Sequence, residues 1–409
     1  MTEPWLTIVG IGDDGWEGLA PKSVEALRAA DILIGGSRHL ALVPADVSAG
    51  KECLTWTEGG GKQGMIDLVL KFRGQRTCVL ASGDPLDRGM GATLLSSIRP
   101  EDFRVIPTAG SISLACARMG WDRARVETIT LHGRPLERIA VHFRPGVKII
   151  ALSHDGTTPA AVARLLVAKG CADSRITVLE HLNGSKEDRI GGLAKDWELE
   201  TCADLNVIAV EVVPGDQARV LSRLPGLPDN AFDHDGQLTK RDIRAAVLSR
   251  LELQPGQLLW DVGSGSGSIA IEMMRASTEN QAVAFERKPE RAERIRENAL
   301  NLGAPGLEVV QGDAPDTFED RRRPERIFLG GGVSEAGLIQ ACWEALLPGG
   351  ILVANAVTLE GEQALLLAKS ALGGELVRIS VELCEELGSF TGWEPQRAVI
   401  LWTVAKDQT

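Results

Sequence analysis

Short apolar segments recur along the first half of the chain, and most of them end in glycine or in a small polar residue. They predict strands at residues 6–9, 32–34, 77–81, 105–106, 148–152 and 176–179. Segments with helical spacing of apolar residues lie between them, as at 21–30 and 114–119. Strands that are apolar throughout are typical of a sheet covered by helices on both faces. The alternation therefore predicts an α/β fold.

The second half repeats this alternation. Predicted strands lie at 258–262, 282–286, 307–311, 326–329 and 351–355, and predicted helices at 269–274, 289–302 and 335–346. Ile243, Ala246, Val247 and Leu251 share one helical face, which predicts an amphipathic helix ahead of the first of these strands. The last two segments, 375–383 and 397–404, read as a pair of antiparallel strands.

A proline- and glycine-rich stretch separates the two halves. Residues 214–229 contain Pro214, Pro225 and Pro228 as well as two glycines, and neither strand nor helix spacing is present. We therefore expect one domain at 1–213, a linker at 214–229 and a second domain at 230–409.

Composition narrows the function. The chain has 409 residues and a net charge of −12, which disfavours a nucleic-acid partner, since phosphate backbones need basic surface. An anionic substrate would need positive charge concentrated locally. The seven cysteines are scattered without a Cys-x-x-Cys pair, which favours reduced thiols, a cytoplasmic location and no zinc site. We also expect no signal peptide and no membrane span, because neither apolar pattern is present.

The strongest chemical signal follows the predicted strand 258–262. Gly263, Gly265 and Gly267 come directly after it, with Ser264 and Ser266 between them, and a helix follows. Glycines let the backbone turn tightly and approach a ligand, and the free N–H groups of a helix start face that ligand. The G-x-G-x-G spacing differs from the G-x-G-x-x-G of dinucleotide-binding loops, which disfavours a nicotinamide dehydrogenase.

Acidic residues stand at the ends of three successive predicted strands. Asp261 lies two residues before the first glycine and can hold an ammonium group, such as that of a methionine moiety. Glu286 ends the next strand, where an acid usually binds ribose hydroxyls. Asp313, followed by Ala314, comes after the third strand, where an adenine amino group could be met.

With the glycine loop, these acids resemble the class I S-adenosylmethionine (SAM) methyltransferases, which have a Rossmann-like fold. Thr239 precedes the amphipathic helix and could serve as its N-cap, as a cover for the cofactor, or as both. The fourth strand ends in Gly330–Gly332 rather than in the motif of enzymes that methylate base amines. Carbon methylation is therefore better supported than base N-methylation.

Three loops of the first half resemble the tetrapyrrole (corrin/porphyrin) methylase family. These are Val9–Gly12, Ser82–Pro85 and Pro107–Ser113, in the family's order. The resemblance covers roughly residues 4–212 and implies a two-subdomain α/β fold (class III) that binds SAM between its subdomains. The sequence departs from the family at Asp13-Asp14-Gly15, where Pro-Gly-Asp is common. The cofactor contacts implied here are Gly12, Ser82, Gly83, Asp84 and Ser111.

The second half resembles the decarboxylating corrin methyltransferases through Leu238–Lys240, the glycine loop and Gly330–Gly332. Both halves in one chain resemble the fused C5,15-methyltransferases of cobalamin (vitamin B12) biosynthesis. That resemblance implies methylation of precorrin-6B at C5 by the first domain. It further implies C15 methylation and loss of the C12 acetate carboxyl group in the second domain, giving precorrin-8X. It also implies two SAM sites per chain and a homo-oligomer.

The chemistry requires alignment of donor and acceptor more than acid–base groups, so no catalytic residue is assigned. The macrocycle carries many carboxylates, which call for arginine and lysine. Lys240, Arg241 and Arg244 lie near the cofactor in sequence and are the candidate substrate contacts. His234 stands alone in a polar turn, and no metal site is expected there.

Two alternatives stay open. The protein could be a SAM-dependent methyltransferase acting on another tetrapyrrole or on RNA, although an RNA substrate would require a basic face. One of the two domains could also be a non-catalytic binding module. The number of SAM molecules bound per chain would distinguish this second alternative.

Overall fold

The chain forms two structural units, and the computed structural model describes residues 4–58, 60–87 and 89–408. The first unit comprises residues 1–134 and 145–218, and the second comprises 135–144 and 219–409. Residues 219–229, which belong to the expected linker, are part of the second unit. Leu227 is 2% exposed and lies in the core of the second unit, with Leu221 packed against that core.

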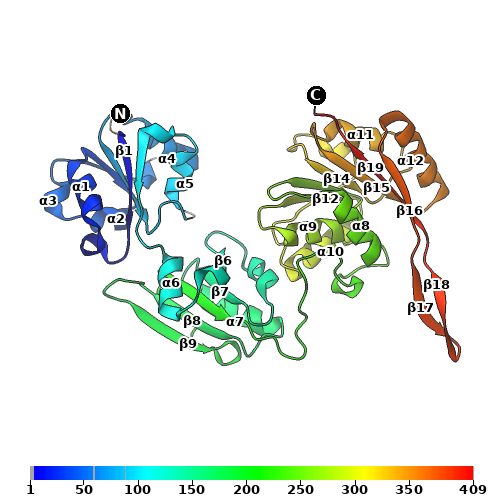
Figure 1. Ribbon diagram of the computed structural model, residues 1–409, viewed down its shortest axis with the longest axis horizontal. Coiled ribbons are helices and arrows are strands. Elements are labelled where there is room, and N and C mark those ends of the chain that lie inside the picture. Colours follow the sequence, from blue (N-terminus) through cyan, green and yellow to red (C-terminus); the bar gives the residue numbers. More distant parts are fainter. Residues whose placement is uncertain (1–3, 59, 88, 409) are drawn as a thin grey trace. The chain divides into compact units, whose positions relative to one another are not determined.

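The first unit contains two lobes, each built on a five-stranded sheet (Figure 1). The first sheet is entirely parallel in the order β3-β2-β4-β1-β5. Its elements are β1 (Leu6–Ile11), α1 (Pro21–Ala29), β2 (Ile32–Gly35), α2 (Ser37–Ala41), α3 (Ala45–Ser48), β3 (Glu52–Thr55), α4 (Gly61–Leu70), β4 (Thr77–Ser82), α5 (Met90–Leu95) and β5 (Phe103–Ile106).

The second lobe has a mixed sheet in the order β6-β7-β10-β8-β9, in which only the β6–β7 pair is parallel. Its elements are α6 (Ser111–Met119), β6 (Val126–Thr130), β7 (Lys148–Leu152), α7 (Thr158–Ala168), β8 (Arg175–Glu180), β9 (Asp188–Leu193) and β10 (Asn206–Glu211).

The second unit has a seven-stranded sheet in the order β13-β12-β11-β14-β15-β19-β16. The first five strands are parallel, and β19 is antiparallel to both of its neighbours. The elements are α8 (Arg241–Arg250), β11 (Leu258–Val262), α9 (Ser268–Ala276), β12 (Gln281–Glu286), α10 (Pro289–Asn301), β13 (Glu308–Gln311), β14 (Arg326–Leu329), α11 (Leu338–Ala345), β15 (Ile351–Ala356), α12 (Leu359–Leu372), β16 (Glu375–Ile379), β17 (Glu382–Leu387), β18 (Phe390–Pro395) and β19 (Val399–Ala405).

This sheet is buried on both faces, as the continuous apolar runs predicted. Leu259 of β11 belongs to the core beneath α8, α9 and α10, whereas its neighbour Trp260 belongs to the core beneath α11 and α12. Successive side chains of a strand point to opposite faces, so each strand supplies both cores.

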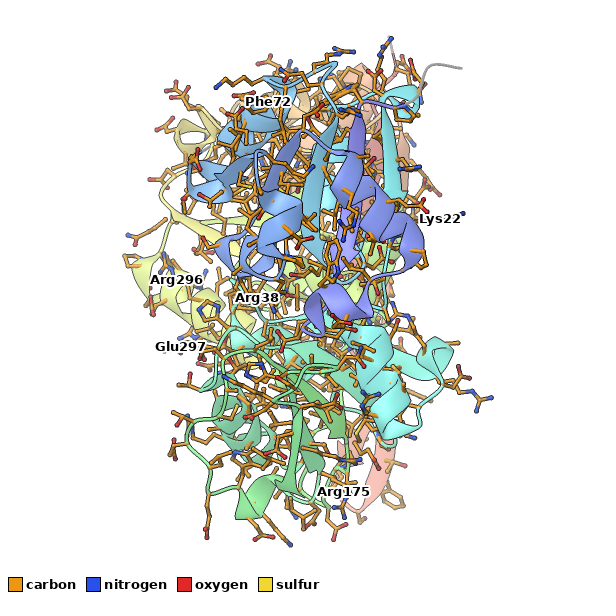
Figure 2. The ribbon with its side chains drawn as sticks, turned by 90° about the vertical axis from the view of Figure 1, so that its left-hand side faces the viewer. Lys22, Arg38, Phe72, Arg175, Arg296 and Glu297 are labelled. Carbon is orange, nitrogen blue, oxygen red and sulfur yellow. The ribbon has the colours of Figure 1, made fainter. Side chains whose placement is uncertain are left out.

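Charged side chains lie outside these layers. Figure 2 shows Lys22 of α1 pointing outward from the first unit, and Arg296 and Glu297 of α10 pointing outward from the second. In α10 the buried side chains are Ala292, Ile295, Asn298 and Ala299. The outer face of α10 is therefore charged.

Most predicted strands are present within one or two residues, but the C-terminal pair is different. The predicted strand 375–383 is broken after Ile379, and β17 and β18 form a separate hairpin that projects from the second unit (Figure 1). The pairing of β16 with β19 is antiparallel as expected. The helix predicted at 335–346 begins three residues late, at Leu338.

Candidate active sites

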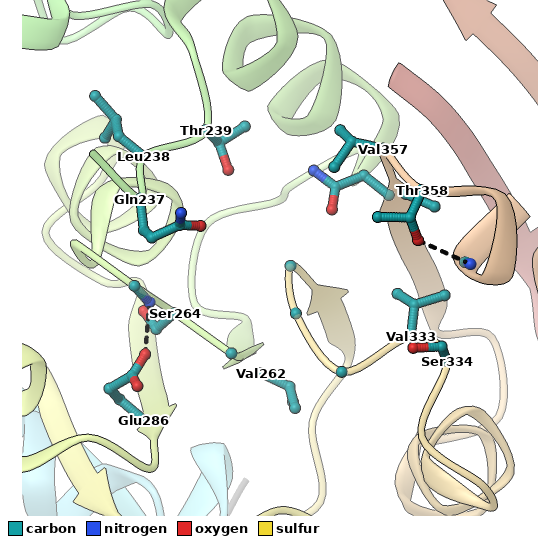
Figure 3. Close-up of a pocket in the computed structure, with 18 of the residues that line it drawn as sticks. Gln237, Leu238, Thr239, Val262, Ser264, Glu286, Val333, Ser334, Val357 and Thr358 are labelled. Atoms are coloured by element: carbon teal, nitrogen blue, oxygen red, sulfur yellow. Dashed lines mark hydrogen bonds between the residues drawn. The ribbon is translucent and has the colours of Figure 1, made fainter. Parts of the chain in front are cut away.

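A cavity of about 630 Å³ lies at the carboxyl ends of β11, β12, β14 and β15 in the second unit (Figure 3). The strand order reverses between β11 and β14, and open α/β sheets bind ligands at such a switch point. In Figure 3 the segment of Gln237, Leu238 and Thr239 faces Val357 and Thr358 across the cavity. The volume is within the range of small-molecule sites.

The glycine loop fits closely into this end of the sheet. The N–H groups of Gly263 and Ser264 both donate to the carbonyl oxygen of Phe285, at 3.0 and 3.1 Å. Gly263 has a φ of +69°, and a Cβ atom on it would lie 2.7 Å from the backbone nitrogen of Gly331. This position therefore excludes any side chain, because the glycines after β11 and β14 touch.

Asp261 lies beneath the loop rather than on the cavity wall. Its side chain is 1% exposed, and Oδ2 accepts hydrogen bonds from Ser264 Oγ (2.8 Å) and Ala270 N (3.2 Å). Burial raises the pKa of this carboxyl to about 7. Oδ1 is buried and has no partner among the described residues. Asp261 thus joins the loop to the start of α9 and keeps one acceptor unused.

Glu286 and Asp313 both line the cavity. Glu286 Oε2 accepts from Gly265 N at 2.9 Å, the bond drawn in Figure 3, and Oε1 accepts from Lys288 N at 3.1 Å. Asp313 is exposed, so its carboxylate meets solvent as well as the cavity. The structure therefore brings these two strand-end acids to one cavity, with Asp261 below it.

The predicted residues of this half divide into two groups. Those that line the cavity are Thr239, Lys240, Gly263, Ser264, Gly265, Glu286, Asp313 and Ala314. Those outside the lining are Arg241, Arg244, Asp261, Ser266 and Gly267. Ser266 is 1% exposed and its hydroxyl has no partner among the described residues, while Gly267 packs closely against Ile295.

Two expectations need correction here. Arg244 cannot contact a substrate, because its side chain is 0% exposed and pairs with Glu272 and Asp229. The N-cap of α8 is Lys240 rather than Thr239, and no side chain caps that helix. Arg241 is exposed but lies outside the cavity lining.

Several lining residues were not predicted. Asn355 at the end of β15 could have been found, because polar residues at the carboxyl ends of parallel strands commonly face ligands. Gln396 and Arg397, between β18 and β19, carry no such local signal. They reach the cavity only because the chain returns to the sheet as the antiparallel strand β19.

The first unit contains a second cavity, of about 260 Å³. Its walls come from the ends of β4 and β7, from α2 and from the starts of α5 and α6. Gly83, directly after β4, has a φ of +54°, and a Cβ atom on it would lie 2.8 Å from the Cα of Gly110. Two of the three loops that resemble the tetrapyrrole methylases, those of Gly83 and Gly110, therefore touch.

Three of the five predicted residues of this half, Ser82, Asp84 and Ser111, line the second cavity. Gly12 and Gly83 do not. Asp84 Oδ1 also accepts from Leu86 N at 2.9 Å, so this carboxylate shapes the turn that it belongs to.

His39 was not singled out from the sequence, and it lines the second cavity. Its Nε2 lies 2.9 Å from Ser82 Oγ, and its Nδ1 is buried with no partner among the described residues. Burial, and then the charge of Arg38, lowers the pKa of this imidazole to about 4. His39 is therefore neutral at physiological pH.

The described part of the chain contains neither a metal site nor a helix that could span a membrane. No group of three or more histidine, cysteine or acidic side chains in residues 4–58, 60–87 and 89–408 could hold a metal ion. The seven cysteines are all free thiols. Within the same residues, each helix is too short or too polar to cross a bilayer.

Two known protein families match separate parts of the chain. Residues 5–193 match the tetrapyrrole (corrin/porphyrin) methylases, and residues 230–406 match the precorrin methyltransferase domain.

One curated relative matches almost the whole chain, and two others match less than half of it. A decarboxylating precorrin-6Y C(5,15)-methyltransferase of Sinorhizobium sp is 42% identical over 406 residues, covering 99% of this chain and 97% of the relative. The cobalt-precorrin-7 C(5)-methyltransferase of Salmonella typhimurium is 34% identical over 43% of this chain and 85% of its own. A probable decarboxylating cobalt-precorrin-6B C(15)-methyltransferase of Pyrobaculum aerophilum is 34% identical over 44% of this chain and 95% of its own.

Proposed function

The chain belongs to the family of decarboxylating precorrin-6Y C5,15-methyltransferases, and from this we propose that it converts precorrin-6B to precorrin-8X. The reaction transfers two methyl groups from SAM, to C5 and C15, and releases the carboxyl group of the C12 acetate as carbon dioxide. The observation that carries the proposal is one chain with two cavities, each walled by a glycine-containing loop at the end of a parallel sheet.

We further propose that each chain has two SAM sites. In the second unit, Glu286 and Asp313 line the cavity with acceptors suited to ribose hydroxyls and an adenine amino group. The unused, buried Oδ1 of Asp261 suits an ammonium group. In the first unit, Ser82, Asp84 and Ser111 offer hydroxyl and carboxylate groups around a smaller cavity. The polar groups of both cavities therefore suit SAM.

The chain's own contribution to methyl transfer is positioning. Bound SAM supplies an electrophilic methyl group, and a meso carbon conjugated to pyrrole nitrogens is already nucleophilic. Held in line, donor and acceptor react without strong acid–base catalysis. The close contact of Gly263 with Gly331 and the bond from Gly265 to Glu286 fix the loop on which that alignment depends.

Decarboxylation requires a different environment. The bond from the acetate methylene to its carboxyl carbon breaks, and its electron pair moves into the conjugated ring. The methylene carbon then takes a proton, so the acetate becomes a methyl group. A carboxylate loses carbon dioxide more readily when water is kept away from it. The apolar lining residues Val262, Val333, Val357 and Val399 suit that role.

We assign C5 methylation to the first unit and C15 methylation with decarboxylation to the second. Support comes from the two shorter relatives, one named for C5 and one for C15 with decarboxylation, each matching less than half of this chain. The two activities therefore occur in separate proteins elsewhere.

Mass spectrometry of precorrin-6B incubated with SAM and the full chain tests the function. The expected product has gained two methyl groups and lost one carbon dioxide. In Gly83→Ala, whose Cβ would meet Gly110, the product should gain one methyl group and still lose carbon dioxide. Gly133→Ala is the control, since its φ of +63° is similar but nothing lies within 4 Å. An unchanged substrate mass with the wild-type chain would refute the assignment.

The number of SAM molecules bound is measured by calorimetry on the full chain. Two molecules per wild-type chain and one per Gly83→Ala chain are expected. One molecule per wild-type chain would make one unit a non-catalytic module.

We also propose that the chain forms a homo-oligomer. Support comes from the β17–β18 hairpin, where Leu387, Phe390 and Trp393 are each at least 69% exposed. Isolated two-stranded hairpins are only marginally stable in water. Light scattering on the wild type and on a Phe390→Glu/Trp393→Glu variant measures the state, and a monomeric wild type would contradict the proposal.

A further inference from the structure

One cation of the larger cavity has no ion-pair partner in the part of the chain that the structure describes. Arg397 lines the cavity together with the glycine loop, and its side chain is exposed, so it lies where the cavity meets solvent. No hydrogen bond or ion pair joins its guanidinium to another described residue. An arginine presents five N–H donors in a planar fork that matches a carboxylate.

The other cations that line this cavity already have carboxylates beside them. Arg291 Nε lies 2.7 Å from Asp235 Oδ2, and Arg287 Nη1 lies 3.4 Å from Glu335 Oε1. Lys240 Nζ is 3.9 Å from Asp229 Oδ2, a looser pair. The positive charge of Arg397 is therefore available to a ligand, whereas that of Arg291 is largely used within the protein.

The backbone holds Arg397 at a defined place. The preceding residue, Gln396, donates its N–H to the carbonyl oxygen of Val381 at 2.9 Å, which closes the base of the β17–β18 hairpin. Val399, two residues after Arg397, begins β19, which lies in the centre of the antiparallel part of the sheet. A side chain between two such anchored residues is a better receptor than one on a free loop.

Charge also makes this arginine unusual. The chain carries a net charge of −12, yet the cavity lining contains four basic side chains (Lys240, Arg287, Arg291, Arg397) and three acidic ones (Glu286, Asp313, Glu335). A site that receives a polycarboxylate on an acidic protein needs such a local excess.

We propose that Arg397 binds a peripheral carboxylate of the tetrapyrrole substrate in the second unit. This rests on the proposed function, which makes the substrate a macrocycle with several carboxylate side chains. A cavity of about 630 Å³ that also holds SAM leaves the edge of such a ring near the opening. Arg397 and Lys240 both line the cavity, and of these two Arg397 is the one without a carboxylate partner among the described residues.

The carboxylate held by Arg397 is not the one that leaves. A charge-assisted, bidentate hydrogen bond stabilises the ionised carboxylate and would oppose loss of carbon dioxide. Arg397 therefore contributes to binding and orientation, and its removal should raise KM more than it lowers kcat.

The first test is steady-state kinetics of the full chain with precorrin-6B. Arg397→Gln should raise KM about tenfold or more, the loss expected for one charge-assisted bond. Arg397→Lys keeps the positive charge but lacks the planar fork of donors, so its KM should lie between those of the wild type and Arg397→Gln. SAM affinity, measured by calorimetry, should be unchanged in both variants. Arg378→Gln is the matched control, because Arg378 pairs with Glu362 at 2.6 Å and lies outside the cavity lining.

An unchanged KM for Arg397→Gln, with normal turnover by the wild type, would overturn the proposal and leave the function intact. A fall in kcat with KM unchanged would also overturn it. If the wild type fails to turn over precorrin-6B, the proposed function fails, and a binding assay then decides about Arg397.

That assay measures fluorescence of uroporphyrin, a tetrapyrrole octacarboxylate, on titration with the full chain, and repeats it with the octamethyl ester. The proposal expects the wild type to bind the acid more tightly than the ester, and Arg397→Gln to lose that preference. Equal binding of the acid by wild type and variant would refute the carboxylate site.

Discussion

Arg244 and Glu272 form an ion pair inside the second unit, with Nε 2.6 Å from Oε1 and side-chain exposures of 0% and 2%. Arg244 also binds the carbonyl oxygens of Leu227 and Thr239, and Glu272 accepts from the N–H groups of Gly226 and Leu227. This buried pair therefore ties α8 and α9 to the segment that carries Thr239 into the cavity wall.

Arg244→Met should destabilise the second unit by about 3–5 kcal/mol, because it leaves the Glu272 carboxylate buried without its cation. Urea unfolding of the full chain measures the loss. Arg250→Met on the same helix is the control, since Arg250 pairs with the 65%-exposed side chain of Glu375 and should lose about 1 kcal/mol or less. A similar loss in both variants would show that the buried pair has no special role.

Adding Glu272→Gln to Arg244→Met should restore part of the stability, because the second change removes the unpaired charge. Strict additivity of the two losses would contradict direct coupling of the pair.

Asp261 should make the stability of the second unit fall as pH rises. Its pKa is raised by burial to about 7, from an ordinary 3.8, so between these values the folded state holds a proton that the unfolded state has released. The stabilising contribution is full below about pH 4 and is lost as pH rises through 7. Asp261→Asn keeps an acceptor for Ser264 and Ala270 and should remove this pH dependence. The loss in free energy of unfolding that it removes is roughly a few kcal/mol at pH 8.

SAM binding to the same variant tests the role proposed for Oδ1. An ammonium group favours the ionised carboxylate, so SAM affinity of the second unit should rise as pH passes upward through 7. In Asp261→Asn the affinity should be lower and lose this rise. A pH profile shared by both proteins would exclude an Asp261–ammonium contact.

His39 should act in the opposite direction in the first unit. Its pKa is lowered by burial, and then by Arg38, from 6.5 to about 4, so the unfolded state binds more protons between these values. Its stabilising contribution is present above pH 6.5 and lost as pH falls through 4. His39→Gln should remove a loss of up to about 3 kcal/mol on acidification. Thermal unfolding from pH 4 to 7 measures it, and an unaltered slope would contradict the buried, neutral imidazole.

Gly263→Ala should abolish SAM binding to the second unit. Its Cβ would meet the backbone of Gly331 at 2.7 Å, and backbone cannot move aside as a flexible side chain can. Gly256→Ala is the matched control, with a φ of +86° but no atom nearer than 3.9 Å. Both changes cost about 1–2 kcal/mol from the left-handed backbone, so only the difference in calorimetric SAM binding reports on the loop. Equal SAM affinity in both variants would refute the contact.

The sequence alone determined the local elements and the positions of the loops. Mostly apolar runs such as Leu258–Val262 and Lys148–Leu152 are strands with these bounds, because a strand buried on both faces is apolar at nearly every position. Glycines and acids at strand ends marked both cavities, because parallel strands bring their carboxyl ends to one edge. The family resemblance of the two halves is likewise carried by these short motifs.

Tertiary structure decided which side chains meet. Arg241 and Arg244 are close in sequence to Lys240, but only Lys240 lines the cavity, because the turn of α8 directs Arg244 to the buried carboxylate of Glu272. A local pattern cannot show that partner, 28 residues away.

Arg397 reaches the same cavity more than a hundred residues after the glycine loop, through an antiparallel pairing that follows an exposed hairpin. The sequence places it only at the start of a strand. Burial and long-range strand pairing decide whether a charged residue lies in a core or at a ligand site. Burial and pairing depend on the packing of the whole sheet rather than on neighbouring residues in the sequence.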